Sequence, residues 1–270
     1  MNKLYLFLSL AIITISCVNK PQQLDPIPEH DNFTLNSTFV NETRVINVWL
    51  PPTYKNGTTD FPVIYMPDGG IKEDFPHIAN TLSKLVGNKS IPPFILVGIE
   101  NTDRRKDLSG VSVVKTDAEY CPLTDGAKNF RAFITKELMP KINTTYRTTN
   151  YKGIIGESLS GLFVMETLFL EPTAFNFYIA MDPSLWWNNN YLEQNASRYL
   201  ANLPKQKTKL WFAGSDAKDI YKHTTNLSET LKKNTPKNLI WNYSPEPKEQ
   251  HNTIFRATKE KALIWSLNTN

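Results

Sequence analysis

The sequence predicts a single α/β domain with a mostly parallel central sheet and helices on both faces. Short apolar runs alternate with longer segments of helical spacing, which indicates strands joined by crossover helices. Residues 61–66 and 94–99 are almost wholly apolar, as parallel strands buried on both faces are. The chain of 270 residues is long enough for one such domain and too short for two typical domains with linkers.

The expected elements follow one another in a regular order. Residues 33–50 alternate in patches and end at Pro51 and Pro52, so they predict an antiparallel hairpin at the sheet edge. Apolar runs and helically spaced segments then alternate to the C-terminus. We expect strands at 61–66, 94–99, 151–155, 175–181, 208–213 and 239–243, and helices at 75–86, 130–142, 159–170, 220–231 and 258–267.

The junction between the strand at 151–155 and the helix at 159–170 reads Gly-Glu-Ser-Leu-Ser-Gly. A serine at such a junction, with small residues two places before and after it, is typical of a nucleophile elbow. The small residues allow strand and helix to approach closely around a strained serine. Ser160 is not the nucleophile, because Leu162 would then occupy a small-residue position. We therefore predict Ser158 as the nucleophile.

Several segments around this motif resemble, in the same order, those of the putative-esterase family of α/β-hydrolases. This family includes enterochelin esterase-like, feruloyl and acetyl-xylan esterase-like, S-formylglutathione hydrolase-like and mycolyltransferase-like proteins. The matching segments are the strand before Asp68-Gly69, a VGI-x-N-x-x-R segment at 97–104, the helix before the elbow with its flanks at 129–147, and Asp-Pro-Ser-Leu-Trp-Trp at 182–187. The resemblance covers about residues 33–266. It implies the α/β-hydrolase fold and a serine esterase without a cofactor or a metal.

His251 is the predicted general base. A serine hydroxyl is a weak nucleophile unless a neighbouring base takes its proton. Among the four histidines, His30 lies in an N-terminal tether, His77 near the start of an early helix and His223 inside a later helix. Only His251 lies in the loop between the last strand and the final helix, where this fold places its base.

Three aspartates are candidates for the acid that orients His251. We favour Asp216, because it follows Gly214 closely in the loop after the strand at 208–213. Asp219 in the same loop and Asp182 at the end of the preceding strand are the alternatives. Some members of the family work with serine and histidine alone, so a dyad also stays open.

The remaining site residues are predicted from the fold and the resemblance. An oxyanion hole combines the backbone N–H of Leu159 with one from the loop after Met66, for which we favour Gly70 over its neighbour Gly69. The resemblance also places Trp186, Trp187 and Arg104 near the substrate. Arg105 adjoins Arg104 in the same segment.

The N-terminus has the features of an export signal. Lys3 precedes an apolar run at 4–15, which is too short to span a bilayer but suits a signal peptide. Ser16-Cys17 resembles a relaxed lipobox, in which Cys17 would be lipidated; ordinary signal cleavage is the alternative. We expect residues 1–17 to be the signal, 18–32 a tether and 33–270 the esterase domain, in a periplasmic or outer-membrane lipoprotein of a bacterium.

Composition excludes other classes. The formal net charge of +4 is scattered and forms no basic block, so nucleic-acid binding has no support. No metal-ligand spacing, phosphate loop or dinucleotide motif is present. We therefore expect a serine carboxylic-ester hydrolase that forms an acyl-enzyme on Ser158. Its substrate would be a small-molecule, polysaccharide or siderophore-type ester, and its membrane contact only the lipid anchor. An acyltransferase of the same fold and a non-catalytic surface binding protein are the alternatives.

Overall fold

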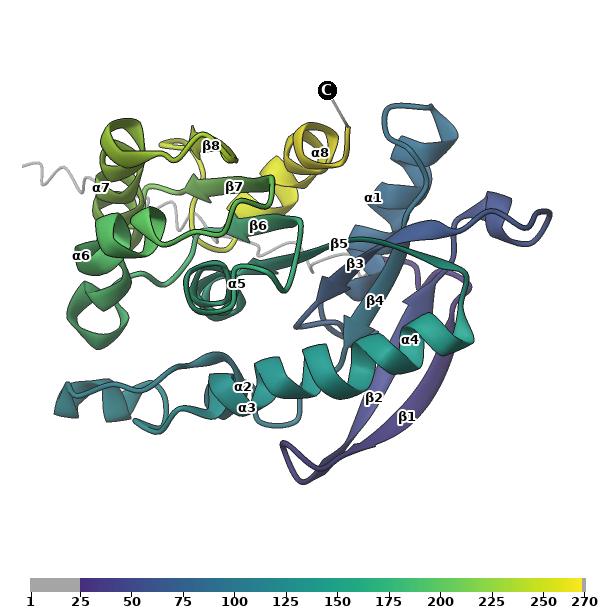
Figure 1. The fold of residues 1–270 in the computed structure, drawn as a ribbon, viewed down its shortest axis with the longest axis horizontal. Helices are drawn as coiled ribbons and strands as arrows, with labels where there is room; N and C mark the ends of the chain where they lie inside the picture. Colours follow the sequence, from purple (N-terminus) through teal and green to yellow (C-terminus); the bar gives the residue numbers. More distant parts are fainter. Residues whose placement is uncertain (1–24, 269–270) are drawn as a thin grey trace, which may run out of the picture.

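The computed structural model of the protein describes residues 25–268, and they form a single sheet with helices on both faces (Figure 1). The signal and lipidation predictions, including Cys17, lie outside the described residues. The eight strands have the order β1-β2-β4-β3-β5-β6-β7-β8. They are β1 (Asp31–Ser37), β2 (Glu42–Trp49), β3 (Phe61–Met66), β4 (Ile95–Ile99), β5 (Thr148–Glu157), β6 (Phe177–Met181), β7 (Thr208–Gly214) and β8 (Leu239–Pro245).

Only the N-terminal hairpin is antiparallel. β1 pairs with β2, and β2 pairs with β4, in antiparallel register, whereas every other pair from β4 to β8 is parallel. The predicted edge hairpin and the predicted parallel sheet are therefore both confirmed. Because all the parallel strands end at the same edge, the residues that follow β3, β5, β6, β7 and β8 meet there.

The helices lie in two layers. α1 (Phe75–Gly87) and α8 (Ile254–Leu267) cover one face, and their apolar residues pack with Ile64, Ile179 and Trp211. The opposite face packs against α3 (Gly126–Phe133), a π-helical turn at Ile134–Leu138, α4 (Met139–Thr145), α5 (Leu159–Leu170), α6 (Trp187–Ala201) and α7 (Lys218–Asn234). Figure 1 shows α1 and α8 on one side of the sheet and α4 and α5 on the other.

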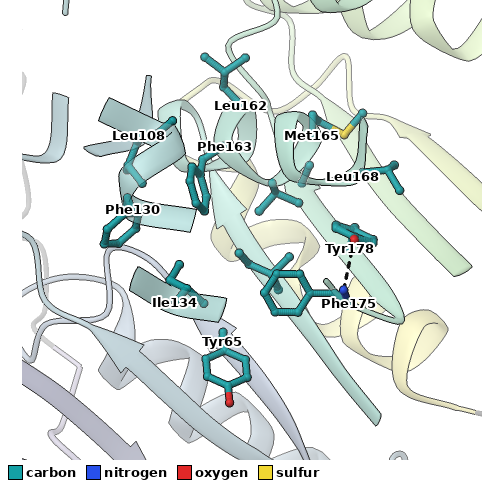
Figure 2. Close-up of a cluster of buried hydrophobic side chains, with 14 of the residues drawn as sticks. Tyr65, Leu108, Phe130, Ile134, Leu162, Phe163, Met165, Leu168, Phe175 and Tyr178 are labelled. Carbon is teal, nitrogen blue, oxygen red and sulfur yellow. Dashed lines mark hydrogen bonds between the residues drawn. The ribbon is translucent and has the colours of Figure 1, made fainter. Parts of the chain in front are cut away.

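Successive apolar residues of a parallel strand pack on opposite faces of the sheet. In β3, Val63 and Tyr65 face the α5 layer, while Ile64 and Met66 face the α1 layer. Helix α5 is buried along nearly its whole length, which is why its sequence is apolar on all sides. Figure 2 shows its side chains packed with aromatic and aliphatic residues from several elements, namely Tyr65, Leu108, Phe130, Ile134, Phe175 and Tyr178.

Two elements were missing from the sequence expectations. α2 (Arg104–Leu108) is a short helix capped by Asp103, whose side chain accepts a hydrogen bond from Lys106 N at 3.2 Å. α6 begins at the tryptophan pair and contains left-handed backbone at Asn188, Asn189 and Asn190. Neither element has the apolar periodicity of an amphipathic helix, so sequence reasoning had little signal for them.

The structure corrects the boundary of the predicted tether. Strand β1 begins at Asp31, and residues before it already contact the domain. The ring of His30 packs edge-on against Phe75 at 5.3 Å, and Asn80 Nδ2 donates to Pro26 O at 2.7 Å. The polar, proline-rich composition predicted a tether over 18–32, but residues 25–32 pack against the domain and are not part of a free tether. No helix within residues 25–268 is long and apolar enough to cross a membrane.

Candidate active site

Ser158 lies on a strained turn between β5 and α5. Its backbone has φ 58° and ψ −116°, a region that side-chain-bearing residues rarely occupy and that costs about 1–3 kcal/mol. The turn is held by Ser158 N, which donates to Met181 O at 2.9 Å, and by Ser184 N, which donates to Ser158 O at 3.1 Å. The serine is thereby fixed against the end of β6, with its side chain partly exposed.

The small residues of the motif have separate structural roles. A Cβ on Gly156 would lie 2.4 Å from Ser160 Oγ and 2.7 Å from Ser160 O, so only glycine fits there. The Ser160 hydroxyl is buried and bonds back to the elbow, accepting from Glu157 N at 2.9 Å and donating to Glu157 O at 3.1 Å. Ser160 therefore stabilises the turn and does not face substrate.

Ser158, His251 and Asp182 form a connected triad. His251 Nε2 lies 2.9 Å from Ser158 Oγ, and His251 Nδ1 lies 2.6 Å from Asp182 Oδ2. These contacts place the imidazole proton on Nδ1, which donates to the Asp182 carboxylate, and they leave Nε2 free to accept from the serine hydroxyl. The hydrogen bond that His251 donates to Asp182 raises the pKa of His251 above its ordinary value, although burial opposes the shift. The arrangement is that of a nucleophile, a base and an orienting acid.

The structure does not support Asp216, the aspartate preferred from the sequence. Within residues 25–268, the carboxylate that contacts His251 Nδ1 is that of Asp182. The side chain of Asp216 is exposed, and its backbone N–H donates to Glu249 O at 3.0 Å. Asp219 is exposed as well. Asp182 is fully buried and accepts from Ser215 N at 2.6 Å and from Ser215 Oγ at 2.7 Å. The loop after β7 thus supplies donors that hold a carboxylate placed directly after β6.

A signal for Asp182 was present in the sequence. It directly follows the apolar strand β6 and precedes a proline, so it lies at the carboxyl edge of the sheet, where the residues after the parallel strands meet. Its backbone φ of 47° turns the chain sharply at that point. Asp216 lies among polar loop residues, where an aspartate needs no special partner. Loop position alone could not distinguish the two.

The other histidines lie away from the serine. The ring of His77 is buried and contacts Asp74 Oδ1 at 2.9 Å through Nε2. His223 pairs with Glu193, and His30 packs on Phe75. Among residues 25–268, His251 is therefore the histidine that the fold brings to Ser158.

The predicted oxyanion donors differ in availability. Leu159 is the first residue of α5, where a backbone N–H has no partner within the helix. Gly70 N donates to Glu73 Oε2 at 2.7 Å, and Glu73 N donates to Gly70 O at 3.0 Å. This reciprocal pair resembles a capping box and occupies the Gly70 N–H. Burial raises the pKa of Glu73 above its ordinary value.

The three residues predicted to contact substrate, Trp186, Trp187 and Arg104, lie in different surroundings. Trp187 is buried, and its Nε1 donates to Gly110 O at 3.1 Å. It lines a cavity of about 570 Å³ with residues of α5, α6 and the loop after α2, and neither Ser158 nor His251 belongs to that lining. Trp186 packs edge-on against Tyr120 at 5.1 Å. Arg104 binds Asp68 through two hydrogen bonds.

Glu157, the residue directly before Ser158, is a partly buried carboxyl group. Burial raises the pKa of Glu157 to about 8, and nearby Asp74, Asp182 and Asp68 add to the effect, while His251 opposes it. Glu157 is therefore largely protonated at neutral pH.

No cluster of three or more histidine, cysteine or acidic residues suited to a metal occurs in residues 25–268. Cys121 is buried, and burial raises the pKa of its thiol.

Comparison with known proteins agrees with this geometry. A family model described as "Putative esterase" matches residues 37–262. The chain belongs to this esterase family. The expected enzyme class, a carboxylic ester hydrolase, is confirmed at the level of that family.

Two curated relatives of this esterase are named for siderophore hydrolysis. Ferri-bacillibactin esterase BesA of Bacillus subtilis (strain 168) is 24% identical over 266 residues, which span 87% of this chain and 91% of the relative. A siderophore triacetylfusarinine C esterase of Aspergillus fumigatus is 30% identical over 186 residues, or 65% of this chain and 62% of that protein.

A solved structure agrees with the fold of this esterase. The crystal structure of an IroE-like serine hydrolase from Shewanella oneidensis superposes with a TM-score of 0.80 at 26% identity. That match covers 88% of this chain and 79% of the other. The α/β-hydrolase fold expected from the sequence is confirmed.

Proposed function

We propose that this protein hydrolyses carboxylic esters through an acyl-enzyme on Ser158. The observation that carries the proposal is the continuous contact from Ser158 Oγ to His251 at 2.9 Å and from His251 to Asp182 at 2.6 Å. A serine so placed loses its proton to the imidazole as it attacks a carbonyl carbon.

The reaction follows from the roles of these three side chains. His251 Nε2 takes the proton of Ser158 Oγ, and the Oγ–carbon bond forms while the carbonyl oxygen becomes an oxyanion. His251 then gives that proton to the leaving alcohol as the ester bond breaks. A water molecule then gives a proton to His251 and attacks the acyl carbon, and as the bond from that carbon to Ser158 Oγ breaks, His251 returns the proton to Oγ and the acid is released. Asp182 orients the imidazole and stabilises the imidazolium that forms.

The oxyanion requires donors aimed at its position. We propose the N–H of Leu159 as one donor, because it opens α5 and adds the favourable helix N-terminus. Gly70 is the second donor once Glu73 yields its hydrogen bond to the N–H. Removing one such donor from a serine hydrolase costs about 100- to 1000-fold in turnover.

We further propose that the substrate is a bulky ester of the siderophore type. The names of the curated relatives support this class. The side chain of His251 is 44% exposed, so the site is open enough for a large substrate and for the hydrolytic water. This openness favours hydrolysis over acyl transfer, which needs water to be excluded.

An ester panel with matched variants tests the proposal. Purified protein is assayed on p-nitrophenyl esters of increasing chain length, then on ferri-bacillibactin and triacetylfusarinine C, with fluorophosphonate labelling alongside. Ser158→Ala and His251→Ala are expected to lose turnover by several orders of magnitude and Ser158→Ala to lose labelling. Ser197→Ala, at an exposed serine of α6, is the control. Activity of Ser158→Ala within about tenfold of the wild type would contradict the assignment.

We also propose that the protein is exported and anchored through Cys17. The support is the charged start, the apolar run at 4–15 and the Ser16-Cys17 pair. Periplasmic or outer-membrane placement would expose the enzyme to imported or external esters.

A further inference from the structure

The cavity of about 570 Å³ lies between α5, α6 and the loop that joins α2 to α3 (Figure 1). Its volume falls within the range of about 300–1,000 Å³ that is typical of small-molecule sites. Its lining on α5 consists of Glu166 and Leu170. Because a helix rises about 1.5 Å per residue, these two residues lie roughly 12 Å and 18 Å along α5 from Ser158. The cavity is therefore separate from the proposed ester site.

Apolar side chains that line this cavity are exposed to solvent. Val113 is 84% exposed, and Val111, Leu170 and Tyr191 are exposed as well. They come from the loop after α2, from the end of α5 and from α6. Single apolar residues scattered over a surface are ordinary, whereas a group of them around one hollow marks a place where a ligand or partner binds.

The loop that carries the two valines is fixed to α6. Trp187 Nε1 donates to Gly110 O at 3.1 Å, and Val113 N donates to Asn188 Oδ1 at 3.1 Å. Asn188 N in turn donates to Asp117 Oδ2 at 2.9 Å. The φ of Asn188 is 52°, in the left-handed region that residues with a Cβ seldom adopt, so these bonds hold it there. The cavity is thus a preformed feature of the fold.

The charged groups in the cavity are acidic. Asp125 and Glu166 belong to the lining, and among residues 25–268 no lysine, arginine or histidine does. Glu166 is buried, and its Oε2 lies 3.4 Å from Arg131 Nη1, which is long for an ion pair. A Cβ on Gly110 would lie 2.5 Å from Glu166 Oε1, so the loop rests on the carboxylate. Burial raises the pKa of Glu166 to about 7, although Arg131 opposes the shift.

Aromatic side chains complete the lining, namely Trp187, Tyr191 and Tyr199. The two tyrosines already contact one cation, which is not part of the lining. Arg198 Nη2 donates to Tyr191 Oη at 3.2 Å, and the Arg198 guanidinium lies 5.1 Å from the centre of the Tyr199 ring. Aromatic rings attract cations through their negative faces. Carboxylates with aromatic and apolar walls are therefore suited to an organic ammonium ion.

We propose that this cavity binds a small organic amine with an aromatic or branched aliphatic body, at a site distinct from Ser158. The ammonium group hydrogen-bonds to the carboxylates of Glu166 and Asp125, and the body packs against Val113 and Leu192. The two carboxylates repel an anionic ligand. The inference goes beyond ester hydrolysis and does not depend on it.

The first experiment compares three probes of similar size and different charge. Naphthylethylamine, naphthylethanol and naphthylacetic acid are titrated into the purified protein by isothermal titration calorimetry in phosphate buffer at neutral pH. The amine should bind about tenfold more tightly than the alcohol, because a hydrogen bond to a charged group is stronger than a neutral one. The acid should bind more weakly than either.

Two variants test whether the amine lies in the cavity. Leu170→Lys places a cation at the exposed end of α5 and should weaken the amine about tenfold, while the alcohol stays within about threefold. Ile264→Lys makes the same change at an exposed residue of α8, on the other face of the sheet, and should leave both affinities unchanged. Glu166→Gln should remove the preference for the amine. Because it also leaves Arg131 without its partner, its Tm is measured alongside, and Leu170→Lys carries the test if Glu166→Gln unfolds.

Labelling of the nucleophile separates this site from the ester site. Protein modified at Ser158 by a fluorophosphonate should bind the amine with unchanged Kd, and loss of binding on labelling would place the amine at the ester site and overturn the inference. Equal affinities for amine and alcohol in the wild type, equal weakening in Ile264→Lys, or no binding at millimolar concentration would overturn it as well. A dimer that Leu170→Lys dissociates, without amine binding, would assign the exposed residues to a contact between copies. A protein that binds the amine and hydrolyses no ester would overturn the proposed function and leave this inference intact.

Discussion

Asp182 Oδ2 lies 2.6 Å from His251 Nδ1, although the two residues are 69 positions apart in the chain. The carboxylate is completely buried, while the imidazole it contacts is 44% exposed. The carboxylate is thus shielded from solvent and fixed by Ser215, whereas the imidazole contacts Ser158 and is accessible to solvent.

Asp182→Asn should reduce kcat by roughly three to four orders of magnitude, because an amide would hold the wrong tautomer of His251. Asp216→Asn and Asp219→Asn are the matched controls and should stay within about threefold of wild type. Asp182→Asn also weakens the bonds from Ser215, so rates are normalised to the folded fraction measured by circular dichroism. A large loss in Asp216→Asn alone would return the acid to the loop after β7.

The pH profile of kcat/KM should rise with a midpoint above about 6.5, the ordinary pKa of histidine. The active form is neutral His251, and its hydrogen bond to the Asp182 carboxylate raises its pKa, so activity is lost as pH falls through that raised value. Initial rates on a neutral ester between pH 5 and 9 measure the midpoint. In Asp182→Asn the midpoint should move down, and an unchanged midpoint would contradict the assigned hydrogen bond.

Glu73→Gln tests the occupied oxyanion donor. The variant keeps a side-chain oxygen near Gly70 N but removes the carboxylate from beside the developing oxyanion. We expect kcat to rise by a few-fold with Tm nearly unchanged, because a neutral amide is the weaker acceptor. Glu249→Gln, a charge-removing change in the loop before His251, provides the comparison. A kcat that falls with Glu73→Gln would mean that the Glu73–Gly70 bond assists the reaction.

Glu157→Gln should stabilise the protein at alkaline pH. The folded-state pKa is about 8 and the ordinary value is 4.5, so between these the folded state binds more protons than the unfolded state. Stability therefore falls as pH rises through that window, and a neutral glutamine avoids the loss. We expect a gain on the order of 1–2 kcal/mol at pH 9 and almost none at pH 4, because Glu157 is partly exposed. Thermal melts across this range would contradict the shift if the gain were independent of pH.

Cys17→Ser should move the protein from the membrane fraction to the soluble periplasmic fraction. Lipid chains on Cys17 would supply the membrane affinity, and serine cannot carry the same linkage. Fractionation and immunoblotting of the full chain expressed in a bacterium measure the distribution. Cys121→Ser is the control, because that cysteine is buried in the domain. Wild-type protein found entirely in the soluble fraction would favour ordinary signal cleavage.

Much of the fold was predictable because its signals are local. The boundaries expected for β3 and α5 agree with those observed, since a buried strand and a buried helix each show in the residues they contain. The elbow motif around Ser158 is equally local, because the strain of the turn demands small residues at fixed spacing. Helix α6 was not predicted, because it opens with three asparagines in left-handed backbone and its apolar residues form no clear helical pattern.

The sequence by itself determined the fold class, the position of the elbow and the loop that carries His251, because each depends on residues close together in the chain. Only the tertiary structure shows that Asp182 contacts His251, that Glu73 accepts from the Gly70 N–H and that Asp68 binds Arg104. The first of these contacts depends on the parallel pairing of β5, β6 and β7, and the last on that of β3 with β4, because such pairing brings the residues after separate strands to one edge. Among several aspartates in polar loops, only that packing selects the one that is buried against the imidazole.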